Sequence, residues 1–262
     1  MRYAEHKKAN KILVEIIGNP DQYYIVHYSC ESFYDITDGR TPRITSIAIR
    51  NFDTAQTDSF SIHKVAEKSK IGISQIENNY DELEKSMLIS YFDFLEKHQR
   101  CKFLHWNMRD INYGFKAIEH RYEVLADNIP FKLADEQKID VARLFVAKYG
   151  VKYIGHPRLE KLLEKNRIEP KDFLQGQKEA TAFVNKEYIK LHQSTLRKVD
   201  TIADLVTRAA NNSLETNSKW WDIYGFSING ILEFLRSRWW GQFVLCLLSI
   251  ILGIVIGKLL GV

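Results

Sequence analysis

The sequence of 262 residues has only three cysteines, Cys30, Cys101 and Cys246. Their spacing fits no metal-ligand pattern, and Cys246 lies in an apolar tail, so a disulfide framework is not expected. A reducing cytosol suits the bulk of such a chain. Residues 1–8 are polar and lack the apolar core of a signal peptide, so we expect no export by that route.

Common catalytic motifs are also missing. The sequence contains no glycine-rich phosphate loop, nucleophile elbow, zinc signature or kinase motif. Its net charge of +4 is mild, and it permits contact with phosphates or anionic lipids without requiring either. Hydrophobic residues make up 45% of the chain, which is ordinary for a folded protein. The composition therefore indicates a folded domain without the signature of a familiar enzyme class.

One long hydrophobic run stands at the C-terminal end. Residues 243–262 carry a single charge, Lys258, and a helix of this length spans about 30 Å, the thickness of a bilayer core. Trp239 and Trp240 precede the run, where interfacial aromatic residues are common. A buried core helix is the alternative, but apolar residues on every face with tryptophans at one boundary favour a membrane. We predict a single-pass transmembrane helix over residues 239–262.

Two further features accompany this segment. Arg236 and Arg238 lie on its N-terminal side, which places the large domain in the cytoplasm. Small residues recur every four positions within the span and predict a face for self-association, although glycine is also common in membrane helices for other reasons. These small residues are Ser249, Gly253, Gly257 and Gly261. The aromatic residues of 211–238 are expected either in the lipid head-group layer or against the underside of the globular domain.

The first half of the chain has the pattern of a small sheet. Residues 23–33 form an apolar run that contains Glu31 near its end, and turn residues follow it. Residues 43–50 and 58–63 alternate as antiparallel strands do. Further along, we predict a short strand over 101–106 and a strand-to-helix junction over 138–145. The predicted helices are 78–98, 112–122, 157–165 and 178–208, the last interrupted near Gln193. The fold class is therefore predicted to be α/β.

The predicted domains follow from these patterns. Residues 1–20 form a lead-in, 21–210 the α/β domain, 211–238 a juxtamembrane aromatic segment, and 239–262 the transmembrane helix.

Three landmarks carry a resemblance to a known family. The first strand ends in Ser29-Cys30-Glu31, a later segment reads His105-Trp106-Asn107-Met108-Arg109-Asp110, and His192 lies on the last long helix. In this order, residues from about 23 to 208 resemble the DEDD family of 3'-5' exonucleases. The resemblance implies a ribonuclease H-like mixed sheet flanked by helices. It also implies catalytic roles for Glu31, Asp110, His192 and Asp200, with Glu31 and Asp110 binding Mg²⁺ or Mn²⁺.

The sequence departs from the family motifs at two positions. Ser29 stands where the family has its first aspartate, and Arg197 stands where the last aspartate is expected. Hydrolysis in this family uses two metal ions, which need roughly four carboxylates. Asp35, Asp38 or Asp200 could substitute from neighbouring segments. The metal-binding set implied by the resemblance is therefore incomplete.

Two functions remain open. The first is a degenerate exonuclease-like module that needs no cofactor, binds nucleic acid or a nucleotide, and signals through a self-associating membrane tail. Its predicted ligand contacts are Asn107, Arg197 and Lys198, because guanidinium and ammonium groups pair well with phosphate oxygens. The alternative is an active metal-dependent 3'-5' exonuclease held at the inner face of a membrane.

Overall fold

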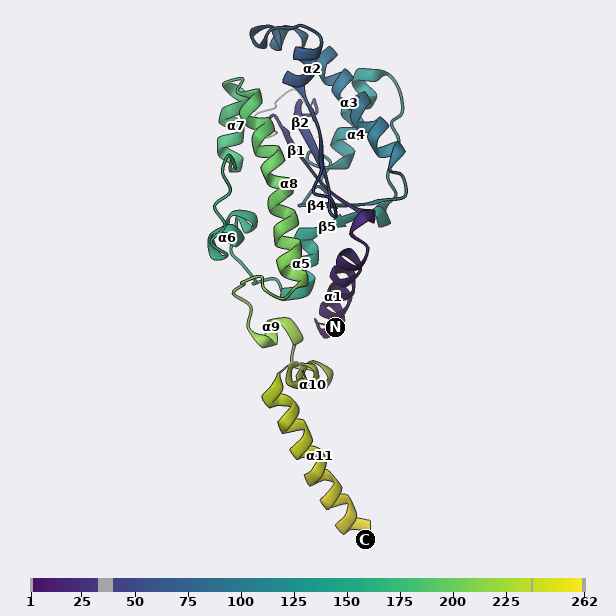
Figure 1. Cartoon of the computed structure of the whole chain (residues 1–262), viewed down its shortest axis with the longest axis vertical. Helices are drawn as coiled ribbons and strands as arrows, with labels where there is room; N and C mark the ends of the chain where they lie inside the picture. The colour runs from purple at the N-terminus through teal and green to yellow at the C-terminus, as the bar shows by residue number, and fades with distance from the viewer. Residues whose placement is uncertain (1, 33–39, 237, 261–262) are drawn as a thin grey trace. The chain divides into compact units, whose positions relative to one another are not determined.

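Five strands form one mixed sheet in the computed structural model, which describes residues 2–32, 40–236 and 238–260 (Figure 1). The strands are β1 (Tyr23–Cys30), β2 (Ile44–Asn51), β3 (Thr57–Ser61), β4 (Lys102–His105) and β5 (Lys138–Asp140). Their order across the sheet is β3-β2-β1-β4-β5. The first three strands pair antiparallel, whereas β4 pairs parallel to β1 and β5 parallel to β4. The carboxyl ends of β1, β4 and β5 therefore meet at one edge.

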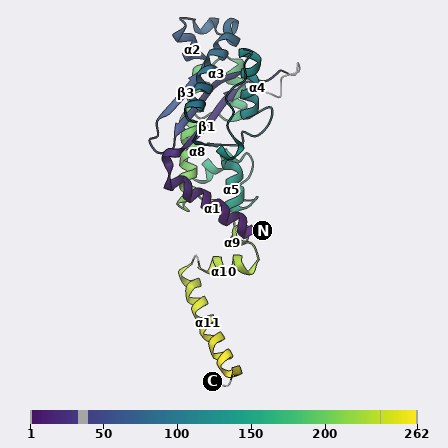
Figure 2. The same ribbon diagram turned by 90° about the vertical axis from the view of Figure 1, so that its right-hand side faces the viewer.

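Helices cover both faces of this sheet. The helices α3 (Tyr80–Lys97) and α4 (Phe115–Ala126) lie on one face, and α8 (Tyr188–Ala210) lies along the other, as the two views show (Figures 1 and 2). Side chains alternate along a strand, so β1 sends Tyr24, Val26 and Tyr28 toward α3 and its odd-numbered residues toward α8. This confirms the predicted α/β class with a mixed sheet flanked by helices.

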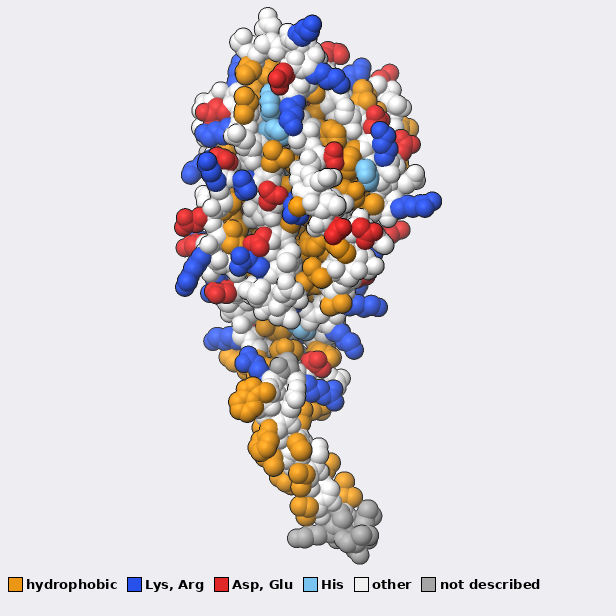
Figure 3. Space-filling model, viewed as in Figure 1, with side chains coloured by type: hydrophobic (Ala, Val, Ile, Leu, Met, Phe, Trp, Pro, Cys, Tyr) orange, Lys and Arg blue, Asp and Glu red, His pale blue; other side chains and the backbone are white. Residues whose placement is uncertain are grey.

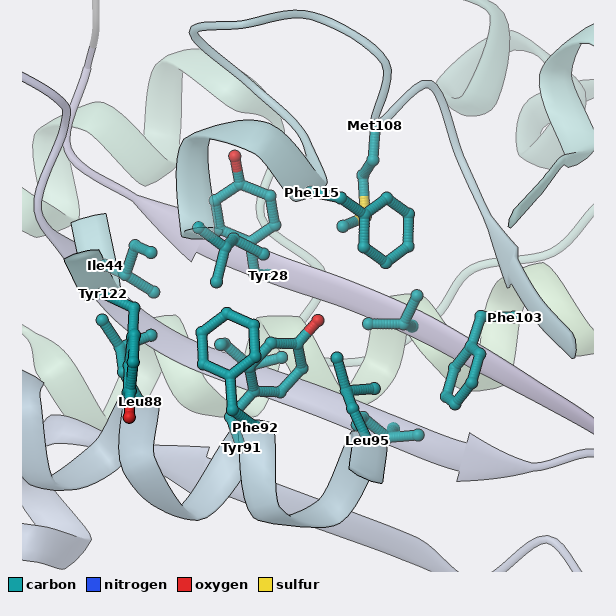
Figure 4. Packing of buried hydrophobic residues seen from close by; sticks show 14 of the residues in the cluster. Tyr28, Ile44, Leu88, Tyr91, Phe92, Leu95, Phe103, Met108, Phe115 and Tyr122 are labelled. Atoms are coloured by element: carbon teal, nitrogen blue, oxygen red, sulfur yellow. The ribbon is translucent and has the colours of Figure 1, made fainter. Parts of the chain in front are cut away.

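The main core lies between the sheet and α3 with α4. Tyr91 and Phe92 of α3 meet at 5.0 Å between ring centroids, and Phe92 contacts Tyr122 of α4 at 4.7 Å (Figure 4). Tyr28 and Phe103 close the cluster from β1 and β4. All five rings are buried, so the apolar face predicted for residues 78–98 does pack against the sheet.

The remaining helices connect and extend this framework. Their bounds are α1 (Arg2–Gly18), α2 (Ile62–Lys68), α5 (Val141–Tyr149), α6 (Arg158–Lys165), α7 (Gly176–Val184), α9 (Trp220–Tyr224), α10 (Ile228–Arg236) and α11 (Trp239–Leu260). Short 3-10 turns lie at Pro20–Gln22, Ile73–Gln75, Glu77–Asn79 and Asp135–Gln137.

Several element boundaries differ from the prediction, among them those of the helix predicted over 112–122, which is α4 at Phe115–Ala126. His63 belongs to α2 and not to the third strand, because β3 ends at Ser61. The break in the predicted helix 178–208 lies between α7 and α8 and not near Gln193, because Lys186 adopts a left-handed φ of 59°. The lead-in is one helix of 17 residues, α1.

Contacts between residues divide the chain into two units. One contains residues 13–144 and 163–214 and holds the whole sheet, together with α7 and α8. The other gathers three separate segments, residues 1–12, 145–162 and 215–262. Within this second unit, the Arg2 guanidinium donates to the backbone oxygens of Lys148 (2.7 Å) and Asp222, and Ser218 Oγ donates to the Tyr149 oxygen at 2.7 Å. These bonds join the three segments.

The helix α11 is the one helix in the described ranges that is long and apolar enough to cross a membrane. From Trp239 to Ile256 its side chains are almost all exposed, which a core helix of a soluble domain would not show. Figure 3 shows hydrophobic side chains gathered over it, with Lys and Arg side chains near the point where it begins. Ser249, Gly253 and Gly257 fall within α11, and Gly261 lies outside the described residues.

A buried ion pair fixes α3 to α4. Arg121 donates from Nε and Nη2 to the Glu84 carboxylate at 2.7–3.0 Å, and the Glu84 side chain is fully buried. Glu84 Oε1 also accepts the Ile44 N–H at 2.8 Å, which ties both helices to β2. Burial raises the pKa of Glu84, and the Arg121 charge opposes that rise. Removing one partner would leave the other charge buried and unpaired.

We therefore expect Arg121→Met to lower the free energy of unfolding by about 3–5 kcal/mol. Asp81→Ala removes the exposed second partner of Arg121 and serves as the control, with an expected loss of less than about 1 kcal/mol. Guanidinium unfolding of the detergent-solubilised chain, followed by far-ultraviolet circular dichroism, measures both. Equal losses in the two variants would contradict the role assigned to the buried pair.

Candidate functional site

A cavity of about 660 Å³ opens at the edge of the sheet where β1 ends. Its wall combines the end of β1, the loop that follows β4, the start of α7 and one position on α8. Five charged or amide side chains on this wall concern the argument below, namely Glu31, Asn107, Asp110, Glu179 and Lys198. Four of these were predicted from the sequence, and the structure brings those four to one cavity.

Glu31 follows the last residue of β1. Its N–H donates to the Arg43 oxygen at 2.8 Å, which continues the pairing of β1 with β2 for one more residue. Its carboxylate accepts two hydrogen bonds from the Arg40 guanidinium, at 2.6 and 2.9 Å. This bidentate arrangement is the strong form of an arginine–carboxylate pair, so the Glu31 charge is already balanced by a cation.

Asp110 lies in the loop after β4, which is tied to β1. Gly114 donates from its N–H to the Tyr28 hydroxyl at 2.8 Å, and Tyr113 stacks on Tyr28 with ring centroids 4.6 Å apart. A Cβ at Gly114 would lie 2.8 Å from the Met108 carbonyl, so only glycine permits this close turn. Asp110 Oδ1 accepts the Asn112 N–H at 2.8 Å. The loop is therefore held in place over the end of β1.

Lys198 brings a buried positive charge from α8. Its side chain is 7% exposed, and its Nζ lies 2.6 Å from Glu179 Oε2 on α7. The other Glu179 oxygen accepts the Ser194 hydroxyl at 3.3 Å, and the Lys198 ammonium lies over the Phe173 ring at 5.4 Å. A buried lysine without an anionic partner would be costly, so the Glu179 carboxylate compensates it.

Two buried polar groups on β1 also line the cavity. His27 Nδ1 and Ser29 Oγ have no hydrogen-bond partner within the described residues. Both side chains point toward α8, because they alternate with Tyr28 along the strand. Burial lowers the pKa of His27 well below its ordinary value, and the Lys198 charge acts in the same direction. A neutral imidazole and a hydroxyl, both buried and without a hydrogen-bond partner among the described residues, therefore lie in the cavity wall.

Three predicted residues lie elsewhere on α8. His192 packs against His63 with ring centroids 5.0 Å apart, and burial lowers its pKa to about 4. Asp200 pairs with Arg50 at 3.0 Å. Arg197 Nε donates to the Lys171 oxygen at 3.0 Å. None of the three is part of the cavity wall that the described residues form.

The position of Asp200 has a simple cause. Its partner Arg50 pairs in register with Ile25, near the start of β1, whereas Glu31 follows the end of that strand. The backbone advances about 3.3 Å per residue along a strand, which separates Ile25 from Glu31 by roughly 20 Å. Asp200 is therefore held toward the opposite end of β1 and does not join Glu31.

Asp140 and His105 support the loop that carries Asp110. Asp140 Oδ1 accepts the Ala142 N–H at 2.9 Å at the start of α5, and its Oδ2 lies 2.8 Å from Arg109 Nε. His105 Nδ1 accepts the Met108 N–H at 3.1 Å, and burial lowers the pKa of His105 to about 4. Its imidazole is therefore neutral near pH 7 and serves as an acceptor at the turn.

The side chains at this edge do not fit a two-metal centre as they are arranged. Within residues 2–32, 40–236 and 238–260, no group of three or more His, Cys, Asp or Glu side chains is close enough to hold a metal ion. Glu31 is engaged by Arg40, and Glu179 by Lys198. Asp35 and Asp38, which could have completed the set, lie outside the described residues.

Glu179 is the site residue that sequence reasoning missed. It lies in a short polar stretch with no motif, and it reaches the cavity only because α7 folds back along α8. The sequence indicated Glu179 only indirectly, because a lysine on a helix that covers a sheet requires an acidic partner. Comparison with models of protein families, with curated proteins and with solved structures finds no match for the chain.

Acidification tests whether His192 is a buried structural side chain. Its pKa falls from an ordinary 6.5 to about 4 in the folded chain, so the unfolded chain binds the proton first as the pH drops. The resulting stability is present above about pH 6.5 and is lost as the pH falls toward 4. We expect His192→Asn to reduce the loss of unfolding free energy between about pH 7 and pH 5 by roughly 1 kcal/mol.

The control is His120→Asn, which changes an exposed side chain and should leave the pH dependence unaltered. Denaturant titrations at the two pH values measure the change. If His192→Asn shows the full wild-type loss, His192 is not held neutral by burial.

Proposed function

We propose that the cavity binds a phosphate-bearing ligand, a nucleic acid strand or a nucleotide, without hydrolysing it. The observation that carries this proposal is the buried Lys198–Glu179 pair in a cavity that also contains Glu31 and Asp110. In the DEDD family that the sequence resembles, acidic side chains in such a place hold metal ions. Here an ammonium group supplies the positive charge that phosphate oxygens require.

The strand order supports the ribonuclease H-like part of this proposal. The first strand and the two that follow it form an antiparallel meander, and the next two strands pair parallel on the other side of the first. Glu31 and Asp110 follow adjacent strands of this sheet, β1 and β4, as the family motifs require. The domain is therefore proposed to be a degenerate relative of these exonucleases.

A ligand phosphate would compete with the carboxylate of Glu179. Both groups are anions that pair with the same ammonium group, and one phosphate oxygen can replace one carboxylate oxygen. Ser29 Oγ and His27 Nδ1 are hydrogen-bonding groups on the same wall, and the exposed side chain of Asn107 lies at its rim. The cavity thus offers one cation and several neutral polar groups for a phosphate and its sugar.

Membrane attachment is the second part of the proposal. The C-terminal helix α11 is long and apolar enough to span a bilayer, and Arg236 and Arg238 precede it. By the positive-inside rule, the domain that carries the cavity lies in the cytoplasm as a single-pass protein. Self-association through the face of Ser249, Gly253, Gly257 and Gly261 would pass ligand binding on to other copies.

Three charge variants test the ligand site. Lys198→Met should weaken binding of a labelled single-stranded oligonucleotide at least tenfold, since a hydrogen bond to a charged group contributes about 1.5–3 kcal/mol. Glu179→Gln should strengthen it, because the competing charge is removed while the Ser194 hydrogen bond is kept. Arg197→Gln is the matched control and should change the affinity by less than about threefold.

Fluorescence anisotropy with RNA and DNA probes in a metal chelator measures the three affinities, and a nucleoside monophosphate as competitor separates strand binding from nucleotide binding. Weaker binding in Glu179→Gln, or equal effects of Lys198→Met and Arg197→Gln, would contradict the proposal.

An active metal-dependent exonuclease is the second candidate. Its supporting observation is that Glu31, Asp110 and Glu179, carboxylates from three different elements, line the same cavity. On this alternative, nucleotide release with Mg²⁺ or Mn²⁺ would fall at least a hundredfold in Asp110→Asn and Glu31→Ala, about the effect of losing a metal ligand.

The binding-only proposal expects no release above background in the wild type or in either variant. End-labelled RNA and DNA strands, resolved by gel after incubation with each metal, distinguish the two functions. Release by the wild type that both variants abolish would establish the enzyme.

A further inference from the structure

The charge of the chain is divided unevenly between its two units. The unit that contains α11 has twelve Lys and Arg against five Asp and Glu, a net charge of +7. The unit that contains the sheet has 25 Lys and Arg against 28 Asp and Glu, a net charge of −3. The net charge of +4 for the whole chain is therefore the sum of a strongly basic unit and a weakly acidic one. The apolar helix α11 belongs to the basic unit.

An exposed apolar surface lies in the same basic unit. Phe226 is 75% exposed and Ile228 is 78% exposed, although both are large hydrophobic residues. Ile231, one turn along α10, is 38% exposed. On a helix, Ile228, Ile231 and Leu235 fall on one side, whereas Asn229, Glu233 and Arg236 fall on the other. We refer to Phe226, Ile228 and Ile231 as the α10 apolar surface.

Part of the remaining surface of α10 is covered by the protein itself, whereas Asn229 and Arg236 are exposed. Phe234 stacks on Trp220 of α9 with ring centroids 5.0 Å apart, and Glu233 accepts the Tyr3 hydroxyl at 3.2 Å. Gly230 packs so closely that an added Cβ would lie 2.1 Å from the Tyr224 oxygen. The α10 apolar surface therefore lies outside these contacts with α1 and α9.

Close packing also fixes α10 against the first turn of α11. An added Cβ at Gly241 would lie 2.2 Å from the Leu235 oxygen, and Gln242 Nε2 donates to the Arg236 oxygen at 3.1 Å. Trp239 and Trp240 occupy this first turn, at the depth where tryptophans mark the membrane–water interface. If α11 crosses a bilayer, this geometry holds α10 at the depth of the lipid head groups.

We propose that the α10 apolar surface, together with Arg236 and Arg238, docks on the anionic head groups of the leaflet that α11 enters. Phe226 and Ile228 bury apolar area at the boundary of the acyl chains. Arg236 and Arg238 are both exposed, and their planar guanidinium groups pair with lipid phosphates. Without Lys258, which lies near the far end of α11, this unit has eleven Lys and Arg against five Asp and Glu, and the remaining net charge of +6 selects an anionic over a neutral surface.

This inference goes beyond the ligand cavity, which lies in the other unit. It rests on the insertion of α11 in a bilayer, which can be measured in the same experiment. Docking of α10 would fix the orientation of the basic unit on the membrane. The lipid composition of the membrane would therefore control that orientation.

Hydrogen exchange of the full chain in lipid nanodiscs tests the proposal. Amides of α10 should exchange more slowly in nanodiscs with about one third phosphatidylglycerol than in pure phosphatidylcholine, with two arginines accounting for a factor of up to roughly 30. Raising the salt to about 0.5 M should remove the difference, because screening shortens the reach of surface charges. Amides of α11 should be protected in both lipids, which shows that the span is inserted.

Two variants complete the test. Arg236→Gln with Arg238→Gln should remove the difference between the two lipids, whereas the control pair Lys68→Gln with Lys97→Gln, on the sheet-containing unit, should keep it. Phe226→Ser with Ile228→Ser should lower α10 protection in both lipids. Equal exchange of the α10 amides in the two lipids would overturn the proposal. Equal protection of these amides in detergent without lipid would also overturn it, because it would indicate that another copy of the chain covers this surface.

Discussion

The parallel pairing of β4 with β1 is the constraint on which the site depends. Because both strands run the same way, the segments that follow them meet at one edge of the sheet, and this brings Glu31 and Asp110 together. The loop after β4 cannot move away from that edge, since Tyr28 holds both Tyr113 and Gly114. Residues of α7 and Lys198 of α8 then complete the cavity wall.

The proposal of an anionic ligand rests on the charge balance within this cavity. Glu31 is paired with Arg40 and Glu179 with Lys198, so two of the three carboxylates on the cavity wall are each matched by a cation that the protein itself supplies. A metal ion would have to displace two such cations, whereas an anionic ligand has only to replace one carboxylate. The arrangement favours an anionic ligand, because a phosphate that pairs with Lys198 keeps the buried charge of the lysine compensated.

Much of the framework was predictable from local patterns. Strand β2 and helix α3 carry a hydrophobic periodicity, and strand β1 and helix α11 are continuous apolar runs. Each pattern can be read within a short stretch of sequence, and each element appears where its pattern predicts. The site was predictable only in part. Glu31, Asp110, Asn107 and Lys198 follow strand ends or a long helix, but Glu179 reaches them through the packing of α7 on α8, which no local pattern encodes. His192 and Asp200 lie on the same helix as Lys198, but they occupy other positions around and along that helix. His192 therefore contacts His63, and Asp200 pairs with Arg50.

We propose that a lysine here takes the place of the metal ions that exonucleases of the DEDD family use. Anomalous scattering from crystals grown with Mn²⁺ tests it most directly, because manganese gives a strong signal wherever it binds in place of Mg²⁺. The account predicts no anomalous peak in the cavity and continuous density between Lys198 Nζ and the Glu179 carboxylate. A manganese peak coordinated by Glu31 and Asp110, with Lys198 turned away from it, would contradict the account.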